Sequence, residues 1–94
     1  MFNKFKQTHL FITGRVQGVF YRVSTKEIAQ KLNLKGWVRN LPDGRVEVVA
    51  QGDESSLKDF ITWAWQGSPG AQVLEVLVTW EEVMQEFNNF RITN

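Results

Sequence analysis

The chain has 94 residues and a formal net charge of +1, with 43% hydrophobic and 22% charged residues. This length fits one compact core, so we expect a single domain over residues 1–94. The composition excludes disordered and collagen-like chains, and the near-neutral charge excludes a global field that would attract nucleic acid. The sequence contains no cysteine, which excludes disulfides, thiolate nucleophiles and thiolate metal sites.

The sequence also lacks the apolar runs of secreted and membrane proteins. Its first residues contain no uninterrupted apolar run of signal-peptide length. Nowhere does the chain offer the roughly 20 apolar residues that a membrane-spanning helix needs. We therefore expect a cytoplasmic protein without a membrane partner.

Residues 8–14, THLFITG, are apolar and β-branched enough to predict a first strand with alternating faces. His9, the single histidine, falls within this strand and has no second ligand nearby, so we expect an ordinary strand histidine rather than a metal site. The apolar spacing becomes helical over about residues 23–32, where Ser24 and Glu27 are placed to form a capping box. The chain therefore begins with a strand followed by a helix.

A hairpin is predicted in the middle of the chain. The segments GWVRN and RVEVVAQ, residues 36–40 and 45–51, have the alternating pattern of strands. The Pro-Asp-Gly sequence between them is typical of a tight turn.

A second helix is predicted over residues 53–67, with Asp53 or Ser55 suited to cap its start. Its apolar side chains recur at helical spacing and form one stripe, made of Leu57, Phe60, Ile61, Ala64 and Trp65. We therefore expect Trp65 to pack in the core. Trp63 falls off the stripe, and we expect it to be partly exposed.

Strands at residues 73–80 and 90–92 complete the order β-α-β-β-α-β. This order favours an α+β sandwich of the ferredoxin-like type, in which an antiparallel sheet of four or five strands carries two helices on one face. In such a fold the first two strands are parallel, and the third lies between them. Their carboxyl ends share one edge of the sheet, so we expect the loop at residues 14–22 to lie near Asn40.

The loop GRVQGVFYR, residues 14–22, has the properties of an anion-binding turn. Backbone amides before a helix start lack partners, and the helix dipole adds positive charge. Gly18 permits the backbone angles of an amide cradle, and Arg22 adds a bidentate guanidinium. The cradle amides would come from Gln17, Gly18, Val19, Phe20, Tyr21 and Arg22. A phosphoryl group fits this cradle, although similar turns also occur without a ligand, and the spacing is that of neither a P-loop nor a dinucleotide fingerprint.

Two segments carry a family resemblance. GRVQGVFYR and GWVRNLPDGRVEVVAQG, residues 36–52, resemble the signature segments of acylphosphatases, small enzymes that hydrolyse carboxyl-phosphate anhydrides. The resemblance continues more weakly through GSPGAQV, residues 67–73, and the terminal FRI. It covers most of the chain and implies one acylphosphatase-like domain over residues 1–94 with a ferredoxin-like fold.

The resemblance also implies the roles of the site residues. The amides of the first signature and Arg22 would bind the phosphate, while Asn40 of the second signature would position the attacking water. Acyl phosphates would be the substrates, and inorganic phosphate or sulfate would bind as product-like ligands. We expect a monomer that needs no cofactor or metal and has no nucleic-acid or membrane partner.

Acyl phosphates have a good carboxylate leaving group, so orientation and charge stabilisation suffice for catalysis. The signatures offer no general base, and we therefore expect the substrate phosphate to take the proton of the water.

Two other functions fit parts of the sequence. A phosphate cradle also suits a noncatalytic phosphate-binding or regulatory module, because a fold does not determine function. The four tryptophans and seven phenylalanines are also compatible with a protein that binds single-stranded RNA. That function needs exposed aromatic and basic residues on the open sheet face. We expect Trp37 and Trp80 to pack in the sheet instead. For Ser68 we expect a local cap, and the alternative is a contact with the edge of the site.

Overall fold

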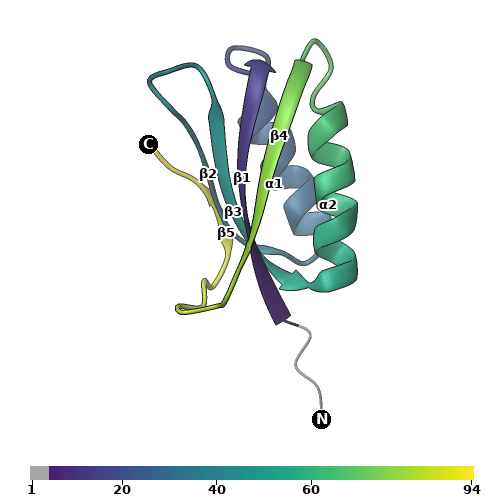
Figure 1. Cartoon of the computed structure of the whole chain (residues 1–94), viewed down its shortest axis with the longest axis vertical. Coiled ribbons are helices and arrows are strands. Elements are labelled where there is room, and N and C mark those ends of the chain that lie inside the picture. The colour runs from purple at the N-terminus through teal and green to yellow at the C-terminus, as the bar shows by residue number, and fades with distance from the viewer. Residues whose placement is uncertain (1–4) are drawn as a thin grey trace.

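The computed structural model describes residues 5–94 and has two layers, a sheet and a pair of helices on one of its faces (Figure 1). The strands are β1 (Phe5–Arg15), β2 (Lys35–Asn40), β3 (Val46–Asp53), β4 (Gln72–Glu81) and β5 (Phe90–Ile92). The helices are α1 (Tyr21–Lys31) and α2 (Glu54–Gln66), and neither described helix is long and apolar enough to cross a bilayer. The predicted order of elements and the ferredoxin-like fold are confirmed.

The sheet has the strand order β4-β1-β3-β2-β5. β3 lies between β1 and β2 and is antiparallel to both, so that Val49 is paired with His9 on one side and with Trp37 on the other. β1 and β2 therefore run parallel, as the crossover through α1 requires. β5 differs from the antiparallel pattern expected of the sheet, because it returns beside β2 in the parallel direction and makes the sheet mixed.

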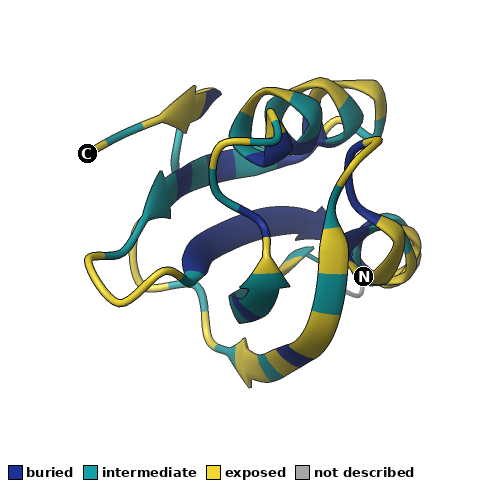
Figure 2. Cartoon of the chain, turned by 90° about the horizontal axis from the view of Figure 1, so that it is seen from above, coloured by how far each residue is buried: buried dark blue, intermediate teal, exposed yellow. Residues whose placement is uncertain are grey.

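The core lies between the sheet and the helices. In β1, Leu10 and Ile12 are fully buried against the helices, whereas His9 and Phe11 lie half-buried on the opposite face, as their alternation predicts. β3, the central strand, is buried along almost its whole length (Figure 2). Each fully buried Leu or Ile stabilises the fold by about 1.5–3 kcal/mol, so this layer fixes the positions in which the loops begin.

Helix α1 begins earlier than its apolar spacing predicts. Its N-cap residue is Phe20, which has left-handed backbone angles and makes no side-chain capping bond. The predicted capping box is wrong, because Ser24 already lies in the first turn and donates its amide to the Phe20 carbonyl at 3.1 Å. The turn at Phe20 lets the helix start directly at Tyr21, so the anion-binding loop and the helix N-terminus are contiguous.

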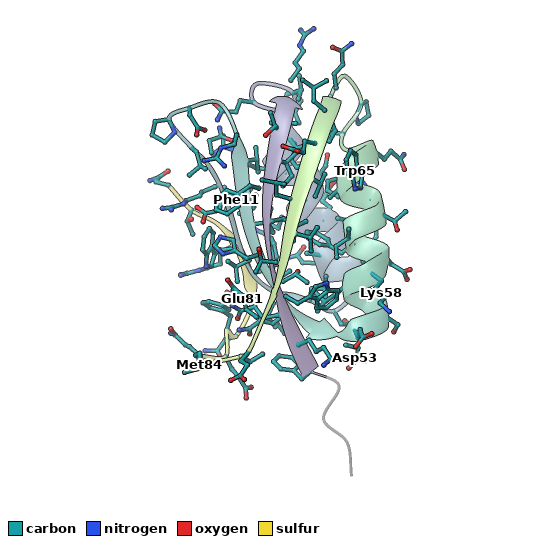
Figure 3. All side chains as sticks on the ribbon, viewed as in Figure 1. Phe11, Asp53, Lys58, Trp65, Glu81 and Met84 are labelled. Atoms are coloured by element: carbon teal, nitrogen blue, oxygen red, sulfur yellow. The ribbon has the colours of Figure 1, made fainter. Side chains whose placement is uncertain are left out.

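Helix α2 buries a different face from the one predicted at its C-terminal end. Trp65 is 50% exposed and lies on α2 (Figure 3). Trp63 instead packs on the core, with its ring 5.4 Å from that of Tyr21 and 6.2 Å from that of Phe60. The prediction for Trp65 is therefore wrong, whereas Trp63 is half-buried, which agrees with the partial exposure expected of it. The packing of Trp63 on Tyr21 was not predicted, because periodicity within α2 does not reveal that α1 lies beside it. Asp53 is the N-cap residue of α2 but makes no side-chain capping bond.

Candidate active site

A pocket opens at the end of the sheet where β1 and β2 finish, which is the upper end in Figure 1. Its cavity measures about 270 Å³. The lining residues come from the β1–α1 loop, α1, β2 and β5, and they are Val16, Gly18, Phe20, Tyr21, Arg22, Val23, Asn40 and Ile92. The fold thus brings Arg22 and Asn40, which belong to different signature segments, into one pocket.

The backbone of the β1–α1 loop has the geometry of an anion-binding nest. Gly18 and Phe20 have positive φ angles of 77° and 62°, whereas Val19 between them does not. Within the described chain, the amides of residues 17–20 donate no backbone hydrogen bond to another residue. Alternation of this kind curves successive N–H groups around a centre, and the N-terminus of α1 adds partial positive charge.

Two side chains hold this loop in place. Gln17 donates from Nε2 to the carbonyl oxygens of Leu41 and Arg45 at 2.8 and 2.9 Å, which ties the loop to the turn that follows β2. Ser68, 4% exposed, donates from Oγ to the carbonyl oxygen of Val19 at 2.7 Å. Ser68 therefore contacts the site loop, the alternative to the local cap expected of it, and the role of the Gln17 side chain was not predicted. Both acceptors are backbone carbonyls, so no residue type in the sequence marks these bonds.

Arg22 and Asn40 present unsatisfied groups to the pocket. Among the ion pairs of residues 5–94, none involves Arg22, so its guanidinium is not neutralised by the protein. Oδ1 of Asn40 is buried and has no hydrogen-bond partner among the described residues. Leaving a buried acceptor unpaired costs about 1–3 kcal/mol. A buried acceptor without a protein partner is therefore typical of a position where a ligand or water binds. The pocket therefore offers one free cation and one free acceptor.

The family model of acylphosphatases matches residues 8–92. The chain belongs to the acylphosphatase family. It is 53% identical over 87 residues to an acylphosphatase of Pyrobaculum islandicum and 50% identical over 86 residues to one of Marinobacter nauticus, covering 92% of this chain in both cases and 92% and 94% of those proteins. The crystal structure of acylphosphatase from Bacillus subtilis matches with a TM-score of 0.92 at 37% identity, covering 95% of this chain and 99% of that one.

In this acylphosphatase-family enzyme, Tyr21 holds the pocket end of α1 against α2. The hydroxyl of Tyr21 donates to the carbonyl oxygen of Ala64 in α2 at 2.8 Å. Burial raises the pKa of this phenol, so the hydroxyl stays neutral. Tyr21 therefore joins the start of α1 to α2 beside the pocket that it lines.

The open face of the acylphosphatase sheet carries a separate polar cluster. Both ring nitrogens of His9 approach carboxylates, with Nε2 at 2.6 Å from Glu47 Oε2 and Nδ1 at 3.2 Å from Glu81 Oε2. Arg39 donates from Nε to the other oxygen of Glu47 at 2.6 Å. His9 is thus the hydrogen-bonded strand histidine that was predicted. Residues 5–94 contain no group of three or more His, Asp or Glu side chains arranged to hold a metal ion.

Proposed function

We propose that this acylphosphatase-family enzyme hydrolyses the carboxyl-phosphate bond of acyl phosphates by direct attack of water. In this proposal the loop amides of residues 17–22 and the Arg22 guanidinium hold the phosphoryl group, while Asn40 orients the water. The observation that carries it is the pocket itself, which combines an unneutralised Arg22, free loop amides and the unpaired Oδ1 of Asn40.

Binding uses charge that is fixed before the substrate arrives. The phosphoryl oxygens accept hydrogen bonds from the loop amides, and the guanidinium of Arg22 donates two parallel bonds. Gln17 and Ser68 hold the loop in this shape, so little reorganisation accompanies the reaction. The same donors stabilise the charge that spreads over the phosphoryl oxygens in the transition state.

The chemical step needs one oriented water. Asn40 Oδ1 accepts a hydrogen bond from the water and aims the water oxygen at phosphorus. As the new P–O bond forms, the bond between phosphorus and the acyl oxygen breaks and its electron pair leaves with the carboxylate. Among the described residues that line the pocket there is no Asp, Glu or His, so the proton of the water passes to a phosphoryl oxygen. The products are a carboxylate and inorganic phosphate.

Binding of single-stranded RNA is disfavoured by the contacts of the open-face aromatic rings. The guanidinium of Arg39 lies 5.3 Å from the ring centroid of Trp37, and that of Arg45 lies 4.8 Å from that of Phe11. These cations occupy ring faces on which nucleobases would stack. Membership of the acylphosphatase family favours an enzyme over a noncatalytic phosphate-binding module, and phosphate release distinguishes the two.

The test is release of phosphate from benzoyl phosphate in the presence of a chelator. We expect Arg22→Ala to lose about 100- to 1,000-fold in kcat/KM, the usual effect of removing one preorganised donor. Arg22→Lys should be nearly as inactive, because an ammonium cannot reproduce the planar fork. Asn40→Ala should lose turnover but keep most of its affinity for inorganic phosphate, measured as direct binding.

Two exposed residues outside the pocket lining, Arg91 and Asn88, provide matched controls. Arg91→Ala and Asn88→Ala should leave turnover unchanged. Phosphate binding by a wild type that releases no phosphate would contradict hydrolysis and support the noncatalytic module. Equal losses of phosphate affinity and turnover in Asn40→Ala would refute the assignment of Asn40 to the water.

A further inference from the structure

Three apolar side chains are exposed at the rim of the pocket, and they come from three different elements. Phe20 of the loop is 78% exposed, Val23 of α1 is 48% exposed, and Ile92 of β5 is 38% exposed. β5 reaches the pocket because it pairs in parallel with β2, which aligns Ile92 with Val38. A cluster of exposed apolar groups beside a polar site is typical of ligand contact rather than of folding.

Phe20 is unusual in both its exposure and its backbone. It has a φ of 62°, a conformation that glycine or asparagine adopts more readily than an aromatic residue. Its ring is largely exposed, so core packing does not explain why a phenylalanine stands there. A strained backbone and an uncovered ring at the same pocket point to a role in binding.

The charge of the pocket is concentrated at one point. Arg22 is the one charged residue among those that line it. The hydroxyl of Tyr21 already donates to Ala64, which leaves Asn40 as the polar side chain with a free atom. Beyond the phosphoryl cradle, the lining is therefore apolar and offers no partner for a second charge on the substrate.

We propose that Phe20, Val23 and Ile92 form an acyl-binding rim that selects acyl phosphates with uncharged aliphatic or aromatic acyl groups. The inference rests on the proposed function, because it requires the phosphoryl group to occupy the cradle. A single oxygen joins the acyl group to phosphorus, so the first carbons of the chain must lie close to the cradle and beside this rim. The contact area between the chain and the rim then determines the preference.

A series of acyl phosphates tests this selection. Acetyl, butanoyl and hexanoyl phosphate have leaving carboxylates of similar basicity, so differences in kcat/KM report chain contact rather than intrinsic reactivity. A fully buried methylene is worth about fourfold, and partial contact along the added chain predicts a preference of about tenfold for hexanoyl over acetyl phosphate. Adipoyl monophosphate has the length of hexanoyl phosphate with a terminal carboxylate, and it should be hydrolysed more slowly than hexanoyl phosphate.

The variant Phe20→Asn removes the ring and suits the left-handed backbone. It should lower the ratio of kcat/KM for hexanoyl over acetyl phosphate to less than half of the wild-type ratio. Val23→Thr makes the part of the rim that α1 contributes more polar with little change in shape. It should lower the same ratio, also where Phe20→Asn fails to fold. Met84→Asn is the control, because Met84 is 87% exposed and lies at the opposite end of the molecule (Figure 3).

Three results would overturn the inference, and only the last of them would also refute the proposed function. A wild type that hydrolyses the whole series with equal kcat/KM has no selective rim. Variants at Phe20 and Val23 that keep the full chain-length preference show that the selection arises elsewhere. A wild type that releases phosphate from neither the series nor benzoyl phosphate is no acyl phosphate hydrolase.

Discussion

Replacing Gln17 by methionine tests whether its side chain joins the loop to the turn after β2. The substitution keeps the volume of the side chain but removes the bonds from Nε2 to the carbonyls of Leu41 and Arg45. Both carbonyls keep a backbone partner, since the amide of Gly44 donates to Leu41 at 3.1 Å and that of Leu41 donates to Arg45 at 2.8 Å. No buried acceptor is orphaned, and the loss is limited to two neutral hydrogen bonds.

At about 1 kcal/mol for each bond, Gln17→Met should lower the free energy of unfolding by about 2 kcal/mol. For a domain of this size the midpoint of thermal unfolding should fall by about 10 °C. Gln17→Glu should be less stable still at pH 7, because an ionised carboxylate accepts but does not donate hydrogen bonds and would face two carbonyl oxygens. Part of this extra loss should be recovered in acid, where the carboxyl is protonated.

Urea unfolding followed by tryptophan fluorescence measures these differences, with Gln30→Met as the control because Gln30 is exposed on α1. Steady-state kinetics with benzoyl phosphate at a temperature where the variant is folded gives the second measurement. If the loop and the turn are held in register by Gln17, both KM and kcat should change. Stability of Gln17→Met within about 0.5 kcal/mol of the wild type, with unchanged kinetics, would refute this reasoning.

Two further substitutions address the loop and the open face. Ser68→Ala should cost about 1–2 kcal/mol and weaken inhibition by phosphate, because the carbonyl of Val19 loses its donor; unchanged phosphate inhibition would contradict the tether. Burial raises the pKa of the Glu47 carboxyl, but hydrogen bonds and charge from His9 and Arg39 outweigh it and hold the pKa below its ordinary value of 4.5. Because the folded pKa is the lower one, the ionised carboxyl stabilises the fold fully above pH 4.5, and this contribution is lost as the pH falls through the folded pKa. Glu47→Gln should therefore flatten the acid side of the stability profile measured by urea unfolding, and an unchanged slope would exclude Glu47 as its source.

The sequence by itself determined the elements and their order. Alternation in residues 8–14, the Pro-Asp-Gly turn and the short terminal FRI are local signals, because strand periodicity and turn chemistry act over a few residues. The order of these elements then placed Arg22 and Asn40 at one end of the sheet. The two signature segments were sufficient to indicate the family.

Tertiary structure alone decided which side chains face a partner. Trp63 packs on Tyr21 because α1 lies beside α2, whereas Trp65 is exposed, and periodicity within a single helix contains no information about its neighbour. Gln17 and Ser68 bond to carbonyls far along the chain, and every residue has a carbonyl, so sequence cannot indicate which one is used. Ile92 joins the pocket only because β5 returns in parallel beside β2. These features depend on contacts between segments that are distant in sequence, and such contacts are fixed only when the whole core is packed.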